Sequence, residues 1–104
     1  WFICMNQGGR LATIMSSKDN EMVKEMARKT DLGESYWLSG VRIALPDTWV
    51  WMSTGLSVMY TDWATNQPSN VRGRNCLDLW QYDNYRWINE DCYTRLYSIC
   101  EYYD

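Results

Sequence analysis

The residue types best able to do chemistry in this chain are its four cysteines, Cys4, Cys76, Cys92 and Cys100. Their number is even, the gaps are wide, and no Cys-x-x-Cys pair suggests a zinc or redox centre. Two disulfides are therefore predicted, although spacing alone leaves three pairings open. Four reduced cysteines in a cytosolic protein fit poorly with three of them lying in the last quarter of the chain. Because disulfides persist in oxidising compartments, we expect a secreted, extracellular protein.

Catalytic chemistry is poorly supported by the remaining residues. The chain has no histidine, which removes both the commonest general base and the commonest metal ligand. Carboxylate pairs such as Glu90-Asp91 exist, but adjacent side chains point apart on a strand or loop, and 13 acidic residues produce such pairs by chance. We interpret these carboxylates as a solvated surface and predict a protein that is not an enzyme and has no catalytic residue.

Composition also bounds the partners and the number of domains. The net charge is −3 and no long run of either sign occurs, so neither a nucleic-acid partner nor an anionic membrane surface is expected. The longest apolar stretches fall short of the roughly 20 residues that a membrane-spanning helix needs, which argues against membrane insertion. A chain of 104 residues without repeats or shifts in composition is predicted to form one domain, residues 1–104.

Two helices are predicted near the start of the chain. Residues 1–7 have the apolar content of a helix tail that ends at Gly8-Gly9. A second helix is predicted over 17–30, because Ser16 and Asp19 resemble a capping box and apolar residues follow at helical spacing. A short strand is predicted between the helices, over 11–14.

The rest of the chain favours strands and one long loop. Short segments rich in Trp, Tyr, Val and Ile predict strands over 36–38, 49–52, 76–80, 85–87 and 97–101. The polar stretch between Tyr60 and Asn75, residues 61–74, is too long for a simple turn and too poor in apolar residues for a core strand. We therefore expect an α+β fold in which a long surface loop is the place to look for function.

Several ordered blocks of the sequence resemble the C-type lectin-like family. They span nearly the whole chain: Cys4 with Gly8-Gly9-Arg10-Leu11-Ala12, Tyr36-Trp37-Leu38-Ser39-Gly40, Trp49-Val50-Trp51, Tyr60-Thr61-Asp62-Trp63, Gln67-Pro68-Ser69, Asn75-Cys76-Leu77-Asp78-Leu79, Tyr85-Arg86-Trp87, Cys92, and Ile99-Cys100-Glu101. The resemblance implies two helices packed on small antiparallel sheets with a long ligand loop, and the chain is similar to arthropod secreted members. The family's first strand lies upstream of the helix that holds the first cysteine, so we expect residues 1–104 to lack it.

The resemblance also implies details that spacing does not give. Cys4 is expected to pair with Cys100, and Cys76 with Cys92. The peptide bond before Pro68 is expected to be cis, because the family shapes its ligand loop with such a proline.

The family's calcium positions are altered in this sequence. Sugar-binding members hold calcium with a Glu-Pro-Asn or Gln-Pro-Asp block, with a carboxylate two residues before the third cysteine, and with an Asn-Asp pair after a core Trp. The corresponding residues here are Gln67-Pro68-Ser69, Arg74 and Ile88-Asn89, none of which is a carboxylate. Because calcium requires six to eight oxygens and Arg74 brings a positive charge, we expect no metal ligand and no cofactor. The alternative is a calcium-dependent lectin whose site is shifted in register onto Asn89, Glu90 or Asp91, with help from Asp62 or Asp78.

Two classes of ligand remain open, a glycan or a protein. A glycan would use polar contacts from Gln67, Ser69, Asn70 and Asn89 and stacking on aromatic rings, for which the candidates are Trp63, Trp80, Tyr82 and Tyr85. We expect Trp37, Trp51 and Trp87 to lie in the core instead. A protein partner would contact the same face through Arg72 and Arg74, since Arg, Tyr and Trp are enriched at interface hot spots. A place in a larger secreted chain or oligomer is compatible with either ligand.

Overall fold

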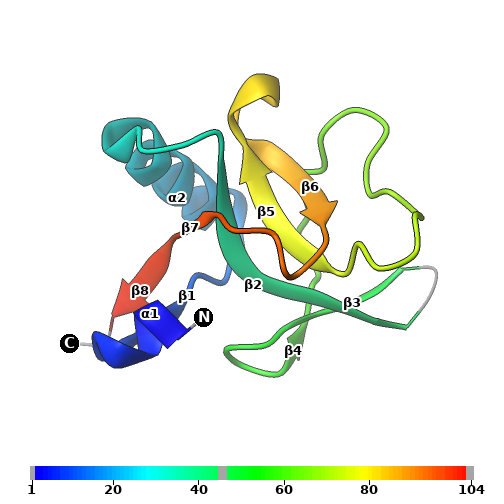
Figure 1. The fold of residues 1–104 in the computed structure, drawn as a ribbon, viewed down its shortest axis with the longest axis horizontal. Helices are drawn as coiled ribbons and strands as arrows, with labels where there is room; N and C mark the ends of the chain where they lie inside the picture. The colour runs from blue at the N-terminus through cyan, green and yellow to red at the C-terminus, as the bar shows by residue number, and fades with distance from the viewer. Residues whose placement is uncertain (1, 45–46, 103–104) are drawn as a thin grey trace.

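The computed structural model describes residues 2–44 and 47–102 as two α-helices, one short 3₁₀ helix and eight strands arranged around one core (Figure 1). The helices are α1 (Phe2–Asn6), α2 (Ser17–Thr30) and η1 (Gln81–Asp83). The strands are β1 (Gly9–Leu11), β2 (Ser35–Ala44), β3 (Thr48–Trp51), β4 (Leu56–Ser57), β5 (Cys76–Trp80), β6 (Arg86–Glu90), β7 (Tyr97–Ser98) and β8 (Cys100–Tyr102). The predicted α+β class is confirmed.

Local signals explain the ends of both α-helices. The Ser16 hydroxyl accepts a hydrogen bond from the Asp19 backbone N–H at 3.2 Å, and α2 begins at the next residue, as predicted. Asp31 ends α2 in the left-handed conformation, with φ of 47°. Gly8 follows α1 with φ of 81°, which explains why a glycine is placed there.

The strands form two sheets. In the smaller sheet β1 pairs with β8, and in the larger sheet the order is β4-β3-β2-β5-β6, with β7 pairing in parallel with β2. The strand predicted over 11–14 is displaced to Gly9–Leu11, because the chain leaves the β8 ladder after Leu11. The segment predicted over 97–101 forms two short strands, β7 and β8, since it leaves one sheet to join the other.

Strand β2 is much longer than its predicted length of three residues. It continues to Ala44 because its second half pairs with β3 after its first half has paired with β5. Gly40 is the first residue of β2 that pairs with β3, and the space around it is tight. A Cβ atom there would lie only 3.0 Å from Leu77 and 3.3 Å from the Trp51 ring. The two-residue strand β4 was not predicted, and it has no apolar alternation that could have predicted it.

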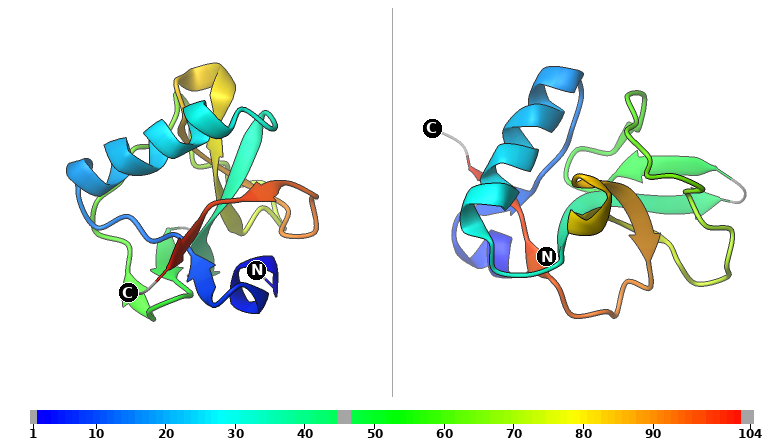
Figure 2. Two further views of the ribbon diagram at one scale, coloured as in Figure 1. Left: turned by 90° about the vertical axis from the view of Figure 1, so that its left-hand side faces the viewer. Right: turned by 90° about the horizontal axis from the view of Figure 1, so that it is seen from above.

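The core lies between the larger sheet and α2, which covers one side of it (Figure 2). Trp51 and Trp87 are fully buried and meet edge to face at 5.7 Å, as the core prediction expected. Trp37 was predicted for the core as well, and that prediction is wrong. It pairs with Asp78 across the sheet, so it points to the outer face, where it is half-buried and donates to the Thr94 carbonyl at 3.2 Å.

Both disulfides have the expected pairing. Cys4 is bonded to Cys100 across 96 residues, and Cys76 is bonded to Cys92 across 16. The first disulfide joins α1 to β8, which lie together in Figure 1. Among residues 2–44 and 47–102, no helix is long and apolar enough to cross a membrane.

Candidate functional site

The predicted long loop leaves the core after Tyr60 and returns to it at β5, forming the open curve beside β5 and β6 in Figure 1. Its first part is anchored on Trp87, whose backbone N–H donates to the Asp62 carbonyl and whose carbonyl accepts from the Ala64 N–H, both at 2.8 Å. The Gln67-Pro68 bond is cis, as expected. The loop is therefore a fixed part of the structure and not a loose connection.

The second part of the loop is held by the guanidinium of Arg42, a residue of β2. This group donates to the Ser69 carbonyl at 3.0 Å and to the Arg74 carbonyl at 2.9 Å. The Arg42 side chain also stacks over Trp49, with 5.1 Å from its central carbon to the ring centroid. It is only 6% exposed, so a positive charge lies inside the base of the loop.

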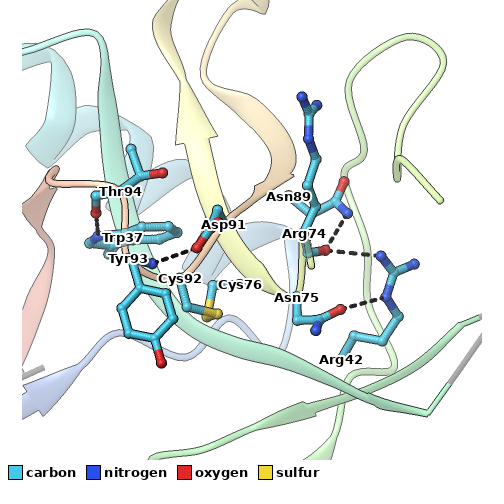
Figure 3. The surroundings of a disulfide bond; sticks show 10 residues. All are labelled: Trp37, Arg42, Arg74, Asn75, Cys76, Asn89, Asp91, Cys92, Tyr93 and Thr94. Atoms are coloured by element: carbon cyan, nitrogen blue, oxygen red, sulfur yellow. Dashed lines mark hydrogen bonds between the residues drawn. A yellow bond between two sulfur atoms is a disulfide. The ribbon is translucent and has the colours of Figure 1, made fainter. Parts of the chain in front are cut away.

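The side chain of Asn89, a residue of β6, binds the same two carbonyl groups, those of Ser69 and Arg74. Its amide nitrogen donates to the Ser69 carbonyl at 2.8 Å and to the Arg74 carbonyl at 2.7 Å. Its amide oxygen accepts from the Ser69 backbone N–H at 2.7 Å. Figure 3 shows the Arg74 carbonyl between the Asn89 amide and the Arg42 guanidinium. Residues 70–74 therefore form a small arch whose two ends are fastened to the sheet through the Ser69 and Arg74 carbonyls.

Sequence reasoning missed Arg42, although a signal for it existed. Tyr36, Leu38, Gly40 and Arg42 alternate along β2 and are all buried. An arginine that continues a core-facing row must find acceptors, because a buried charge without partners is very costly. The polar loop predicted over 61–74 was the obvious supplier of such acceptors.

The positions of the family's calcium ligands lie around this arrangement. Arg74, predicted to bring a positive charge to the site, has an exposed side chain that points away from Arg42, so that prediction is corrected: Arg42 supplies the internal charge (Figure 3). The backbone N–H of Ser69 donates to the Asn89 side chain, and the Gln67 side chain is half-buried. Ile88 neighbours Asn89 on β6 and therefore faces the opposite side of the sheet.

The carboxylates of the shifted-register alternative do not gather around Asn89. Asp62 binds Lys24 at 2.7 Å, and Asp91 accepts from the Tyr93 backbone N–H at 2.9 Å. Asp78 and Glu90 face away from Asn89, on the outer side of the sheet. In the part of the chain that the structure describes, no group of three or more His, Cys, Asp or Glu side chains could hold a metal ion.

The predicted stacking residues also fail to form one surface. Trp63 packs against Trp49 at 5.2 Å and against Trp87 at 5.9 Å, so it belongs largely to the core. Tyr85 is only 8% exposed, and this burial raises the pKa of its hydroxyl. Trp80, the last residue of β5, and Tyr82 of η1 meet edge to face at 5.9 Å.

The side chains that the arch leaves exposed are Asn70, Val71, Arg72 and Arg74. Two are guanidinium groups, and no carboxylate occurs anywhere from Trp63 to Asn75. The loop is therefore positively charged, whereas the chain as a whole carries −3. Of the seven predicted contact residues, Asn70 and Arg74 lie on this exposed surface, and Gln67 and Ser69 are half-buried beside it. Asn89 and Trp63 support it from within, whereas Tyr85 is buried elsewhere, under Arg28 of α2.

Comparisons with known proteins agree with this architecture. The family model of the lectin C-type domain matches residues 2–102. C-type lectin 16 of Aedes aegypti is 28% identical over 94% of this chain and 70% of its own length. Tetranectin of Mus musculus is 33% identical over 95% of this chain and half of its own length.

Solved structures give the same result. A Ca²⁺-dependent type II antifreeze protein in its Ca²⁺-free form is 31% identical, with a TM-score of 0.79 over 95% of this chain and 77% of that one. A calcium-independent type II antifreeze protein is 25% identical, with a TM-score of 0.76 over 95% of this chain and 72% of that one. Related proteins are generally binding proteins and not enzymes. The match over nearly the whole chain shows that it belongs to the C-type lectin domain family.

Proposed function

We propose that this domain is a non-enzymatic extracellular recognition module that binds an acidic surface of a partner protein through the arch over residues 70–74, without calcium. The observation that carries the proposal is the support of the arch by Arg42 and Asn89, which bind both of its ends while Arg72 and Arg74 remain exposed. A preorganised cationic surface favours fast association with an acidic partner. Two disulfides and the secreted character of similar lectins support an extracellular location.

The chemistry at the base of the arch supports the independence from calcium. A calcium ion needs oxygen ligands with negative charge, whereas the Ser69 and Arg74 carbonyls already accept N–H donors from Arg42 and Asn89. A cation there would have to displace the Arg42 guanidinium, which is itself positively charged. The Arg42 guanidinium therefore holds the loop where a calcium ion would otherwise do so.

Calcium is expected to leave the thermal stability unchanged. A ligand that binds only the folded state raises the melting temperature, so melts in millimolar calcium and in chelator should coincide. Calorimetric titration with calcium should show no saturable heat. A melting temperature that rises with calcium concentration and saturates would contradict calcium independence.

Charge reversal of the arch tests the recognition itself. Arg74→Glu is expected to abolish capture of a partner from extracellular fluid, in chelator, and the binding of the wild-type domain is expected to weaken with added salt. Lys29→Glu is a matched control, because Lys29 is an exposed cation on α2, away from the loop. A glycan array in chelator provides the other outcome: saturable glycan binding that survives Arg74→Glu would contradict the protein-binding proposal.

A further inference from the structure

A groove of about 690 Å³ lies on the outer face of the larger sheet, away from the arch. Its walls include Trp80 at the end of β5, Tyr97 of β7, Glu34 and Arg95, and Glu90 of β6 forms part of its lining. The strand register explains this placement. Trp80 and Glu90 point to the face opposite Leu79 and Asn89, so the groove and the arch use opposite faces of the same sheet.

A carboxyl pair, Asp78 and Glu90, lies on the groove side of the sheet, and Glu90 also lines the groove. Asp78 faces the same side of the sheet as Glu90 and is fully buried. Within the described residues, no other side chain or backbone group donates to either Asp78 oxygen or to the buried Oε2 atom of Glu90, so the two carboxyl groups hydrogen-bond to each other. Burial and the neighbouring Glu90 carboxyl raise the pKa of Asp78 to about 10. Asp78 is therefore protonated at neutral pH and donates to Glu90, which leaves the other Glu90 oxygen as the acceptor on the groove side.

The aromatic walls beside Glu90 are already held in place. Trp80 packs edge to face on Tyr82, and the Tyr82 hydroxyl donates to the Glu34 carboxylate at 2.8 Å. Tyr97 is 52% exposed and leans on Tyr36, with ring centroids 6.4 Å apart. Aromatic faces and a carboxylate acceptor together favour a cationic group, through cation–π attraction and charge-assisted hydrogen bonds.

We propose that this groove is a second binding site, which takes a basic side chain of a partner protein between Trp80 and Tyr97 with Glu90 as its acceptor. An arginine or lysine side chain donates to the Glu90 oxygen that is not turned toward Asp78, and its aliphatic part covers the Trp80 ring. Arg95, at the rim, has the same charge as the incoming group and opposes its entry. Glu90 and the aromatic walls favour a basic segment at this site, whereas the arch favours an acidic one.

The experiment uses Nα-acetyl-arginine amide and Nα-acetyl-lysine amide as probes, with the neutral Nα-acetyl-norleucine amide as the control. Titration is followed by NMR at the Trp80 indole N–H. We expect the two cationic probes to shift this signal saturably and the neutral one to leave it in place. Glu90→Gln is expected to weaken binding by roughly tenfold, because it removes a charge-assisted hydrogen bond. Arg95→Ala should strengthen binding.

The outcomes separate this site from the arch. Arg74→Glu should leave probe binding unchanged, since Arg74 lies on the other side of the sheet, and unaltered NMR spectra elsewhere establish that each variant is folded. Equal binding of the neutral probe, or undiminished binding by a folded Glu90→Gln variant, would overturn the proposal. Because these readouts do not involve the arch, they hold whether or not the arch binds an acidic partner.

Discussion

Replacing Asp62 with asparagine is expected to lower the free energy of unfolding by about 3 kcal/mol, because it removes the close counter-ion of the buried Lys24 ammonium. Lys24 lies on α2 with a side chain only 6% exposed, and its Nζ atom is 2.7 Å from the Asp62 carboxylate. The same carboxylate oxygen accepts from the Asn20 amide at 2.8 Å, and the Asn20 oxygen accepts from the Trp87 indole at 3.0 Å. One carboxylate thus connects α2, the start of the loop and the core.

Glu21→Gln is the matched control, since Glu21 approaches the same Lys24 ammonium at 4.0 Å but is 67% exposed. An exposed pair contributes at most about 1 kcal/mol, so this change should have little effect. Urea unfolding of both variants measures the difference. Adding Lys24→Met to Asp62→Asn should recover part of the loss, because the unpaired charge is then removed. Equal losses in Asp62→Asn and Glu21→Gln would show that the buried pair does not hold the loop.

The parts of the fold that sequence predicted well depend on local chemistry. The start of α2 follows from the hydrogen bond between Ser16 and Asp19, and the end of α1 follows from Gly8. Strand β5 has its predicted bounds, because Leu77 and Leu79 alternate with residues of the other face. The disulfide pairing and the cis bond before Pro68 came from family resemblance, as spacing alone could not choose among three pairings.

The parts that sequence missed depend on contacts between distant segments. Trp37 looked like a core residue, but the pairing of β2 with β5 turns it to the outer face. Arg42 was not singled out in the sequence, although the alternation along β2 makes it the support of the loop. Asp62 was expected to assist calcium binding only if the site were shifted in register. In the folded protein its carboxylate instead forms an ion pair with Lys24 of α2. In each case the register of a strand or the packing of a helix decides what the side chain can reach.

The stability of this domain is expected to fall as the pH rises above about 4, because of the fully buried Asp78. Burial and the neighbouring Glu90 raise the pKa of Asp78 to about 10 in the folded protein, against an ordinary value of 3.8. Between these two values the folded state keeps a proton that the unfolded state has released. Folding therefore becomes less favourable with rising pH, and this one group contributes at most about 1.4 kcal/mol for each pH unit.

Asp78→Asn is expected to remove this slope and to make the protein more stable than wild type at pH 8, by at least about 2 kcal/mol. The amide has almost the shape of the protonated carboxyl and can still donate to Glu90, but it has no proton to lose. Urea unfolding of both proteins from pH 4 to pH 9 measures the effect, and the two curves should meet near pH 4. Asp47→Asn, at an exposed position, should follow the wild-type curve. Parallel curves for Asp78→Asn and wild type would mean that Asp78 is ionised in the folded protein.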